Sequence, residues 1–370
     1  MAVWSCAVEN LVTAPAYLAL YRDANVLITG HTGFKGAWLS LWLKNLGANV
    51  TGFALPPEDI KRDLYAVANV EDEINSVYGD LRDLTAVSTV IKDIRPDIIF
   101  HLGAQSLVRR SYAEPVSTYA TNVMGAVNLL EAARHCRETK AIVIVTSDKC
   151  YQNRELGNDF VEDDPMGGLD PYSSSKGCAE LVTNAYRHSF FQGPNAALVG
   201  SARAGNVIGG GDWCEDRLIP DIVRSVEQDK AVVIRNPNSV RPWQHVLEPL
   251  RGYLMLGAQL TGGNDTFAEG WNFGPKPDAA IAVQKIAQRF VEIWGQGSVK
   301  SQPDLSNLHE AHLLTLDIGK SQSKLGFSPV LDIEETLKLT ADWYRKFLEN
   351  PENAQTLCLD QLLDYTRRLP

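Results

Sequence analysis

The sequence has few cysteines, and none of them is placed for a metal site or a disulfide framework. The six cysteines include no Cys-x-x-Cys pair and no Cys/His cluster at metal-ligand spacing. This argues against zinc-binding and disulfide-rich secreted proteins, so we expect reduced thiols and no metal. The cysteines are Cys6, Cys136, Cys150, Cys178, Cys214 and Cys358.

Long apolar runs and blocks of positive charge are also missing. No segment approaches the ~20 apolar residues of a transmembrane helix, and the N-terminal stretch carries Glu9 and lacks the basic region of a secretory signal. The formal net charge is -10, without a basic patch for nucleic acid or an anionic membrane. We therefore expect a soluble, cytoplasmic protein that binds neither membrane nor nucleic acid.

The chain does contain regularly repeated strand and helix patterns. Short apolar runs, typical of strands buried on both faces of a parallel sheet, alternate with helical patterns at 37–43, 84–91 and 123–131. Repeated strand–helix units predict a doubly wound α/β domain of the Rossmann type. The expected strands cover residues 26–29, 49–53, 74–78, 98–101, 141–146 and 197–202.

The pattern divides the chain into three parts. Residues 1–24 form an N-terminal extension without a recognisable task, and residues 25–203 form the predicted Rossmann domain, to which the chain returns around 240–260. Residues 204–370 mainly form a smaller, mixed α/β lobe that binds the substrate. This lobe begins with glycine-rich and Pro-, Asn- and Trp-rich segments and ends with amphipathic helices around 282–294 and 333–348.

A glycine-rich loop, Gly30-His-Thr-Gly33-Phe-Lys-Gly36, follows the first strand and opens a helix. Such a loop lets a pyrophosphate approach the helix-terminal amides, although a purely structural turn is the alternative if the loop stood alone. Asp80, after the third strand, favours a nucleotide. The carboxylate expected near residues 52–54 for an adenosine ribose is missing. His31 and Lys35 offer other polar contacts, unless Lys35 is merely solvated.

Two further motifs carry acid/base chemistry. Tyr172 and Lys176 are four residues apart, so on a helix they share one face, where the ammonium can lower the pKa of the phenol. The run Ser147-Asp148-Lys149 follows the fifth strand, at the edge of the sheet where ligands bind. Alone, Asp148-Lys149 is more often a solvated strand-end pair and Tyr-x-x-x-Lys a chance match. Their joint placement favours catalysis.

Taken together, the motifs resemble the extended short-chain dehydrogenase/reductase family. Within that family the chain is similar to the nucleotide-sugar 4,6-dehydratases. It is most similar to the branch that acts on CDP-glucose, because Lys149 stands where related enzymes carry glutamate. The resemblance covers residues 25 to about 344 and rests on Thr29-Gly-x-Thr-Gly-Phe-x-Gly36, Asp80-Leu81, His101-Leu-Gly-Ala-Gln105, Asn122, Thr146-Ser-Asp-Lys-Cys-Tyr151, Tyr172-x-x-x-Lys176, Arg203-x-x-Asn206 and Asn272-x-Gly274.

The resemblance implies a lyase mechanism in which NAD is reduced and then oxidised again within one reaction. Tyr172 takes the proton of the sugar 4-hydroxyl, to which Ser147 is hydrogen-bonded, while hydride passes to NAD. Asp148 then acts as the acid and Lys149 as the base in removing water across carbons 5 and 6, and the hydride returns to carbon 6. A lysine base must be neutral although its reference pKa is about 10.4. Asp148 and Lys149 both reach the sugar only if the chain leaves regular strand geometry.

The resemblance also implies the ligands and their contacts. It implies a homodimer that makes a CDP-linked precursor for deoxysugars of surface polysaccharide such as lipopolysaccharide. Arg241 could bind the ligand or could be a surface charge beside a buried Trp243. Arg109 is a further candidate for lining the pocket. For NAD the implied residues are Gly30, Thr32, Gly33, Phe34, Lys35, Gly36, Asp80, Leu81, Leu102, Gly103, Ala104, Gln105, Asn122, Thr146, Tyr172 and Lys176. For the nucleotide sugar they are Gln105, Ser147, Asn206, Arg217, Leu218, Arg241 and Asn272.

The sequence is also compatible with two other functions. A 4-epimerase of the same family needs the Tyr172/Lys176 pair but no Asp148/Lys149 couple. A catalytically silent, NAD-binding regulator would need neither couple for its task.

Overall fold

The computed structural model describes residues 15–154, 157, 159–276, 279–302 and 313–370, so Cys6 lies outside the described residues. Its centre is a seven-stranded sheet of order β11-β6-β5-β4-β1-β2-β3, and all neighbouring strands are parallel. This confirms the expected doubly wound α/β fold. The strands are β1 (Asn25–Thr29), β2 (Asn49–Ala54), β3 (Asn75–Tyr78), β4 (Ile98–His101), β5 (Ala141–Val145), β6 (Leu198–Ala204) and β11 (Gly270–Phe273).

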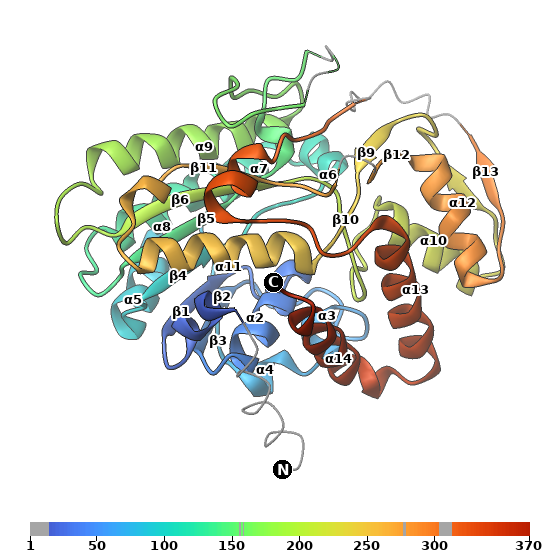
Figure 1. Cartoon of the computed structure of the whole chain (residues 1–370), viewed down its shortest axis with the longest axis horizontal. Helices are drawn as coiled ribbons and strands as arrows, with labels where there is room; N and C mark the ends of the chain where they lie inside the picture. The colour runs from blue at the N-terminus through green and yellow to red at the C-terminus, as the bar shows by residue number, and fades with distance from the viewer. Residues whose placement is uncertain (1–14, 155–156, 158, 277–278, 303–312) are drawn as a thin grey trace.

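Both faces of the sheet are buried, as the uniformly apolar strands predict. In β1, Val26 and Ile28 belong to one apolar cluster and Leu27 to a second, because successive strand residues point to opposite faces. Helices cover each face (Figure 1). They are α2 (Phe34–Asn45) and α11 (Leu247–Thr261) over the first cluster, and α5 (Leu84–Ile94), α8 (Gly125–Ala133) and α9 (Pro171–Ser189) over the second.

The smaller lobe lies beside the sheet (Figure 1). It pairs β8 (Val232–Ile234) with β13 (Val299–Ser301), and α10 (Leu218–Glu227) packs against α12 (Val283–Trp294). Helix α13 (Ile333–Glu349) begins at a capping box of Asp332 and Glu335. The helices expected around 282–294 and 333–348 are therefore α12 and α13.

The remaining strands and helices are mostly short, apart from α14. The further strands are β7 (Val207–Ile208), β9 (Val240–Pro242), β10 (Gln244–His245) and β12 (Ala280–Ala282). The further helices are α3 (Leu64–Val67), α4 (Val70–Glu73), α6 (Val108–Ala113), α7 (Pro115–Tyr119) and α14 (Ala354–Arg367). The 3₁₀ and π turns are η2 (Ala16–Tyr21), η3 (Ala120–Met124), η4 (Asp148–Cys150), η5 (Asp265–Phe267), η7 (Ser321–Leu325) and η8 (Pro351–Asn353). None of the described helices combines the length and the apolar character needed to cross a membrane.

The chain returns to the sheet over a longer stretch than 240–260. Helix α11 packs on β5 and β6, and the sheet then gains β11, which pairs with β6 through Trp271 opposite Ala202. The described end of the N-terminal extension also belongs to this layer, because η2 packs on α11 and Tyr21 donates a 2.6 Å hydrogen bond to the carbonyl of Leu254. Residues 15–22 therefore help to cover the sheet.

Candidate active site

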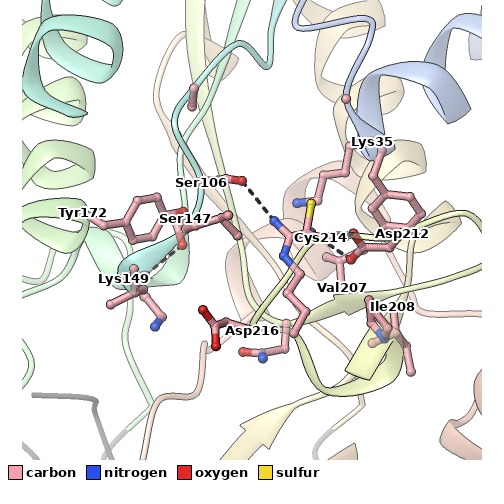
Figure 2. A pocket seen from close by; sticks show the side chains of 18 of the residues that line it. Lys35, Ser106, Ser147, Lys149, Tyr172, Val207, Ile208, Asp212, Cys214 and Asp216 are labelled. Atoms are coloured by element: carbon pink, nitrogen blue, oxygen red, sulfur yellow. Dashed lines mark hydrogen bonds and ion pairs between the residues drawn. The ribbon is translucent and has the colours of Figure 1, made fainter. Parts of the chain in front are cut away.

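A cavity of about 600 Å³ lies at the carboxyl ends of β1, β4 and β5, between the sheet and the smaller lobe. Figure 2 shows Tyr172, Ser147 and Lys149 together on one side of this cavity. Most of the residues predicted from the sequence line it. They are Gly30, Thr32, Gly33, Phe34, Lys35, Gly36, Asp80, Leu81, Leu102, Gly103, Ala104, Thr146, Ser147, Asp148, Lys149, Tyr172, Lys176, Asn206, Arg217, Leu218 and Arg241.

The glycine-rich loop has no room for side chains at its tight points. Gly30 has a φ of +76°, and a Cβ on it would lie 2.7 Å from the Cα of Gly103. A Cβ on Gly36 would lie 2.1 Å from the carbonyl oxygen of Gly30. The loop therefore brings the bare backbone and the first amides of α2 to the cavity, which is the arrangement that holds a pyrophosphate.

The adenosine end of this subsite is unusual. Asp80 carries an ion pair with Arg82 at 2.5 Å, which lowers the pKa of the carboxyl. Strand β2 ends without a carboxylate, and the ring of His31 lies over Gly52, where a Cβ would come within 2.1 Å of the ring. Burial lowers the pKa of His31 to about 4, so the ring is neutral at pH 7. The glycine loop and Asp80 fit NAD, but a β2 carboxylate for its ribose is missing.

The Ser147-Asp148-Lys149 segment leaves strand geometry immediately after β5, as expected. Ser147 is the N-cap of the 3₁₀ turn η4, and its Oγ accepts a 3.2 Å hydrogen bond from the amide of Lys149. This turn lets Asp148 and the half-buried Lys149 line the same cavity. Two adjacent residues of a regular strand would point to opposite faces.

The surroundings of Asp148 favour the protonated form of its carboxyl. Burial raises the pKa of its carboxyl, against the opposing effects of Lys149, of the hydrogen bond from Ser147, and of the charges of Arg241 and Lys35. Its Oδ2 atom is buried and has no hydrogen-bond partner among the described residues. A raised pKa favours the protonated form, which can donate a proton.

Tyr172 and Lys176 lie in the first turns of α9. The helix begins with Asp170 as N-cap, which accepts a 2.9 Å hydrogen bond from the amide of Ser173. Burial raises the pKa of Tyr172 to about 12, while a hydrogen bond with Ser147 and the charge of Arg217 act in the opposite direction. Burial also lowers the pKa of Lys176 to about 8, and its Nζ donates to the carbonyl of Val145 at 3.4 Å.

Lys35 is part of the site and not a solvated loop residue. Its Nζ lies 3.5 Å from the hydroxyl of Tyr253 on α11. Burial and the nearby positive charges of Arg217 and Lys176 lower its pKa to about 7. The lysine therefore changes charge near neutral pH, inside the cavity that holds the acid/base residues.

The opposite wall carries arginines. Arg217 forms a 2.8 Å ion pair with the buried Asp212 and a 3.1 Å hydrogen bond to Ser106 (Figure 2). Arg241 is buried and lines the cavity, so it is not a surface charge, and Trp243 is buried beside it. Arg109 also lines the cavity. Other residues line the cavity although no sequence motif singled them out, namely Ser106, Cys214, Asp216 and Arg235.

Gln105 and Asn122 do not line the cavity, contrary to expectation. The Gln105 side chain bonds the backbone of Leu107 and the hydroxyl of Thr118. Asn122 bonds the backbone amide and carbonyl of Gln105 and also Ser175 on α9. Asn122 therefore ties the loop after β4 to α9, and Gln105 ties it to α7, so both side chains make structural contacts.

Asn272 also lies outside the cavity lining. Its side chain accepts a 2.7 Å hydrogen bond from Tyr151 and donates to the carbonyls of Phe160 and Asp317. These bonds occupy the amide inside the protein, because β11 places Asn272 in the interior and not in the cavity lining. Among the described residues no cluster of His, Cys, Asp and Glu has the arrangement of a metal site.

Known proteins are similar to this chain in sequence and in fold. A family model described as GDP-mannose 4,6 dehydratase matches residues 27–340. A CDP-glucose 4,6-dehydratase of Salmonella typhimurium is 47% identical over 336 residues, which cover 90% of this chain and 93% of that protein.

Solved structures give the same picture of the fold. The epimerase Mth375 from Methanothermobacter thermautotrophicus has a TM-score of 0.77 at 24% identity, covering 91% of this chain and 96% of that chain. MoeE5, solved in complex with UDP-glucuronic acid and NAD, has a TM-score of 0.73 at 26% identity, covering 87% of this chain and 99% of its own.

Proposed function

The chain belongs to the GDP-mannose 4,6 dehydratase family of extended short-chain dehydrogenases/reductases, and on this premise we propose that it is a CDP-glucose 4,6-dehydratase. It removes water from CDP-glucose and gives CDP-4-keto-6-deoxyglucose, with NAD as cofactor. One observation carries the proposal: Asp148 and Lys149 line the same cavity as Tyr172 and Lys176. Two acid/base couples in one site match a redox step combined with an elimination.

In this reaction each acid/base residue has a separate role. Tyr172 takes the proton of the sugar 4-hydroxyl, and its hydrogen bond with Ser147 acts against the rise in its pKa that burial causes. The glycine loop, Asp80 and Lys176 would hold NAD, which when bound would supply the hydride acceptor and donor for the redox chemistry. Lys149 takes the proton from carbon 5, and Asp148 protonates the departing 6-hydroxyl. The pKa of Asp148 is raised by burial, which favours the protonated form that this step requires.

Two findings support CDP-glucose over other nucleotide sugars. The Salmonella protein that shares 47% of its residues over 90% of this chain is named for that substrate. Lys149 also stands in the acid/base couple where related dehydratases carry glutamate, as the sequence resemblance implies. Arg217, Arg241 and Asn206 face the same cavity and offer donors for a diphosphate.

A panel of nucleotide sugars tests the proposal. CDP-, UDP-, dTDP- and GDP-hexoses are incubated with the protein, with and without added NAD, and the products are analysed by mass. We expect loss of one water from CDP-glucose, with a gain on adding NAD because the ribose carboxylate is missing. A product of unchanged mass would favour the 4-epimerase. Absence of turnover with every sugar would favour a catalytically silent regulator.

We further propose that the enzyme is a homodimer. Val116 on α7 and Leu181 on α9 are 81% and 59% exposed, although α7 and α9 pack against each other. Exposed apolar side chains on adjacent helices suit a symmetric pairing of two copies. Sedimentation should show a dimer, and Leu181→Lys should shift it toward monomer; a wild-type monomer would contradict the proposal.

We also propose that the protein acts in the cytoplasm, in the synthesis of surface polysaccharide. Every cysteine in the described part of the chain is a free thiol, which suits a reducing cytoplasm. The product would serve as a deoxysugar precursor for surface polysaccharide such as lipopolysaccharide. Loss of the deoxysugar from the polysaccharide of a strain without the gene would support this role.

A further inference from the structure

One carboxylate in the cavity joins two arginines from different parts of the fold. Oδ1 of Asp216 lies 2.6 Å from Nη1 of Arg235 and 3.8 Å from Nε of Arg109. Arg109 belongs to α6 in the sheet domain, whereas Arg235 directly follows β8 in the smaller lobe. All three residues line the cavity, and Figure 2 shows Asp216 among its lining side chains. A single oxygen therefore bridges the two walls of the site.

Asp216 has a left-handed backbone conformation and an accessible side chain. Its φ is +59°, a left-handed conformation that aspartate and asparagine adopt more readily than most residues. The side chain is 39% exposed, and those of Arg109 and Arg235 are 36% and 35% exposed. Ion pairs this exposed contribute little to folding stability. Another anion can therefore replace this carboxylate without unfolding its surroundings.

The neighbouring carboxylate shows the contrast. Asp212 pairs with Arg217 at 2.8 Å, but its side chain is only 4% exposed, and its Oδ1 also accepts a hydrogen bond from the amide of Cys214. Asp212 is thus fixed in the wall of the cavity. Asp216, in contrast, is accessible on this wall of the cavity.

We propose that Asp216 is an internal counter-ion that holds Arg109 and Arg235 until the diphosphate of the nucleotide sugar replaces it. The inference rests on the proposed function for the identity of the ligand. The two guanidinium groups can each bind phosphate oxygens through two donors, whereas they now share one carboxylate oxygen, which lies 2.6 Å from Arg235 and 3.8 Å from Arg109. The ligand must displace Asp216, so this residue lowers the affinity for the diphosphate and keeps both arginines oriented in its absence.

The test uses Asp216→Asn in the full chain. Asparagine keeps the shape of the side chain and tolerates the left-handed backbone, but it removes the competing charge. We expect the dissociation constant of CDP, measured by calorimetry, to fall roughly 3- to 10-fold. We expect the KM for CDP-glucose to fall in parallel and kcat to change less than KM. An unchanged or larger dissociation constant would overturn the proposal.

Two matched variants separate this effect from others. Asp342→Asn removes the same charge from an exposed ion pair with Arg345 on α13, outside the cavity lining, and should leave CDP binding unchanged. Asp216→Glu retains the charge and should bind CDP within about two-fold of wild type. Weaker binding in both Asp216 variants would indicate a structural role and overturn the proposal.

The outcome does not depend on turnover. If the wild-type enzyme fails to convert CDP-glucose, the proposed function fails, while the binding of CDP and of inorganic pyrophosphate still tests Asp216. Tighter binding of either probe to Asp216→Asn alone would support the counter-ion role. Absence of binding of both probes to every variant would overturn it.

Discussion

Oγ of Ser147 donates a 2.9 Å hydrogen bond to Oδ1 of Asp148, while Oδ2 of the same carboxyl is buried and has no partner among the described residues. The space around Oδ2 exists because residue 205 is glycine, where a Cβ would lie 2.9 Å from that oxygen. One oxygen is therefore positioned by the protein, and the other, which has no partner among the described residues, can carry the acid proton.

Asp148→Asn should separate oxidation from elimination. Asparagine keeps the hydrogen bond from Ser147 but cannot donate an acid proton to the departing hydroxyl. We expect the release of water to slow by about 10²- to 10⁴-fold, while reduced cofactor accumulates and is seen by its absorbance. Equal loss of both steps would remove Asp148 from the role of acid.

Lys149→Ala should stop the reaction at the same stage for a different reason. The variant loses the base for carbon 5, but it keeps Tyr172 and Lys176 for the first hydride transfer. We expect trapped reduced cofactor and no exchange of the carbon 5 proton with heavy water. Asp148→Asn should still allow that exchange, so the two variants distinguish base from acid. Normal elimination by Lys149→Ala would exclude the lysine from the mechanism.

The activity should rise with pH across the neutral range. Burial raises the pKa of Tyr172 to about 12, and only the deprotonated phenol acts as a base, so its active fraction increases as pH rises. The value of kcat/KM, measured from pH 6 to 9, should increase accordingly, and Tyr172→Phe should lose activity throughout. A first hydride transfer that slows as pH rises over this range would contradict the assignment of Tyr172 as the base, because Asp148 acts only in the later elimination.

Acid should destabilise the fold through His245. Burial lowers its pKa to about 3, below the ordinary 6.5, so between these values the unfolded chain binds a proton that the folded chain does not. The free energy of unfolding therefore falls as pH drops through this window, by up to about 1.4 kcal/mol per pH unit. His245→Asn preserves an acceptor for the amide of Leu247 and should flatten this dependence in urea unfolding at pH 7, 6 and 5. Parallel curves would contradict the buried neutral ring.

The main features of the sheet and the glycine loop were predictable from the sequence because local patterns specify them. Short apolar runs gave β1 to β6, and the break after β5 followed from the need to present Asp148 and Lys149 together. Strand β11 was not predicted, because its four residues join the sheet only through pairing with β6, far away in the chain.

Side-chain direction was harder to predict than position in the sheet. Asn272 and Gln105 match ligand-binding motifs, yet their amides bond the protein's own backbone. Lys35 could be solvated or buried by sequence alone, and its contact with Tyr253 spans 218 positions. Long-range contacts of this kind decide whether a polar side chain serves the ligand or the fold.

The most direct test follows a label through the reaction. CDP-glucose carrying deuterium on carbon 4 is incubated with the enzyme and NAD, and the product is analysed by mass spectrometry and NMR. The account predicts a 4-keto-6-deoxy product that has lost one water and carries the deuterium on carbon 6. A product that retains the substrate's elements, or one that has lost water without deuterium at carbon 6, would contradict it.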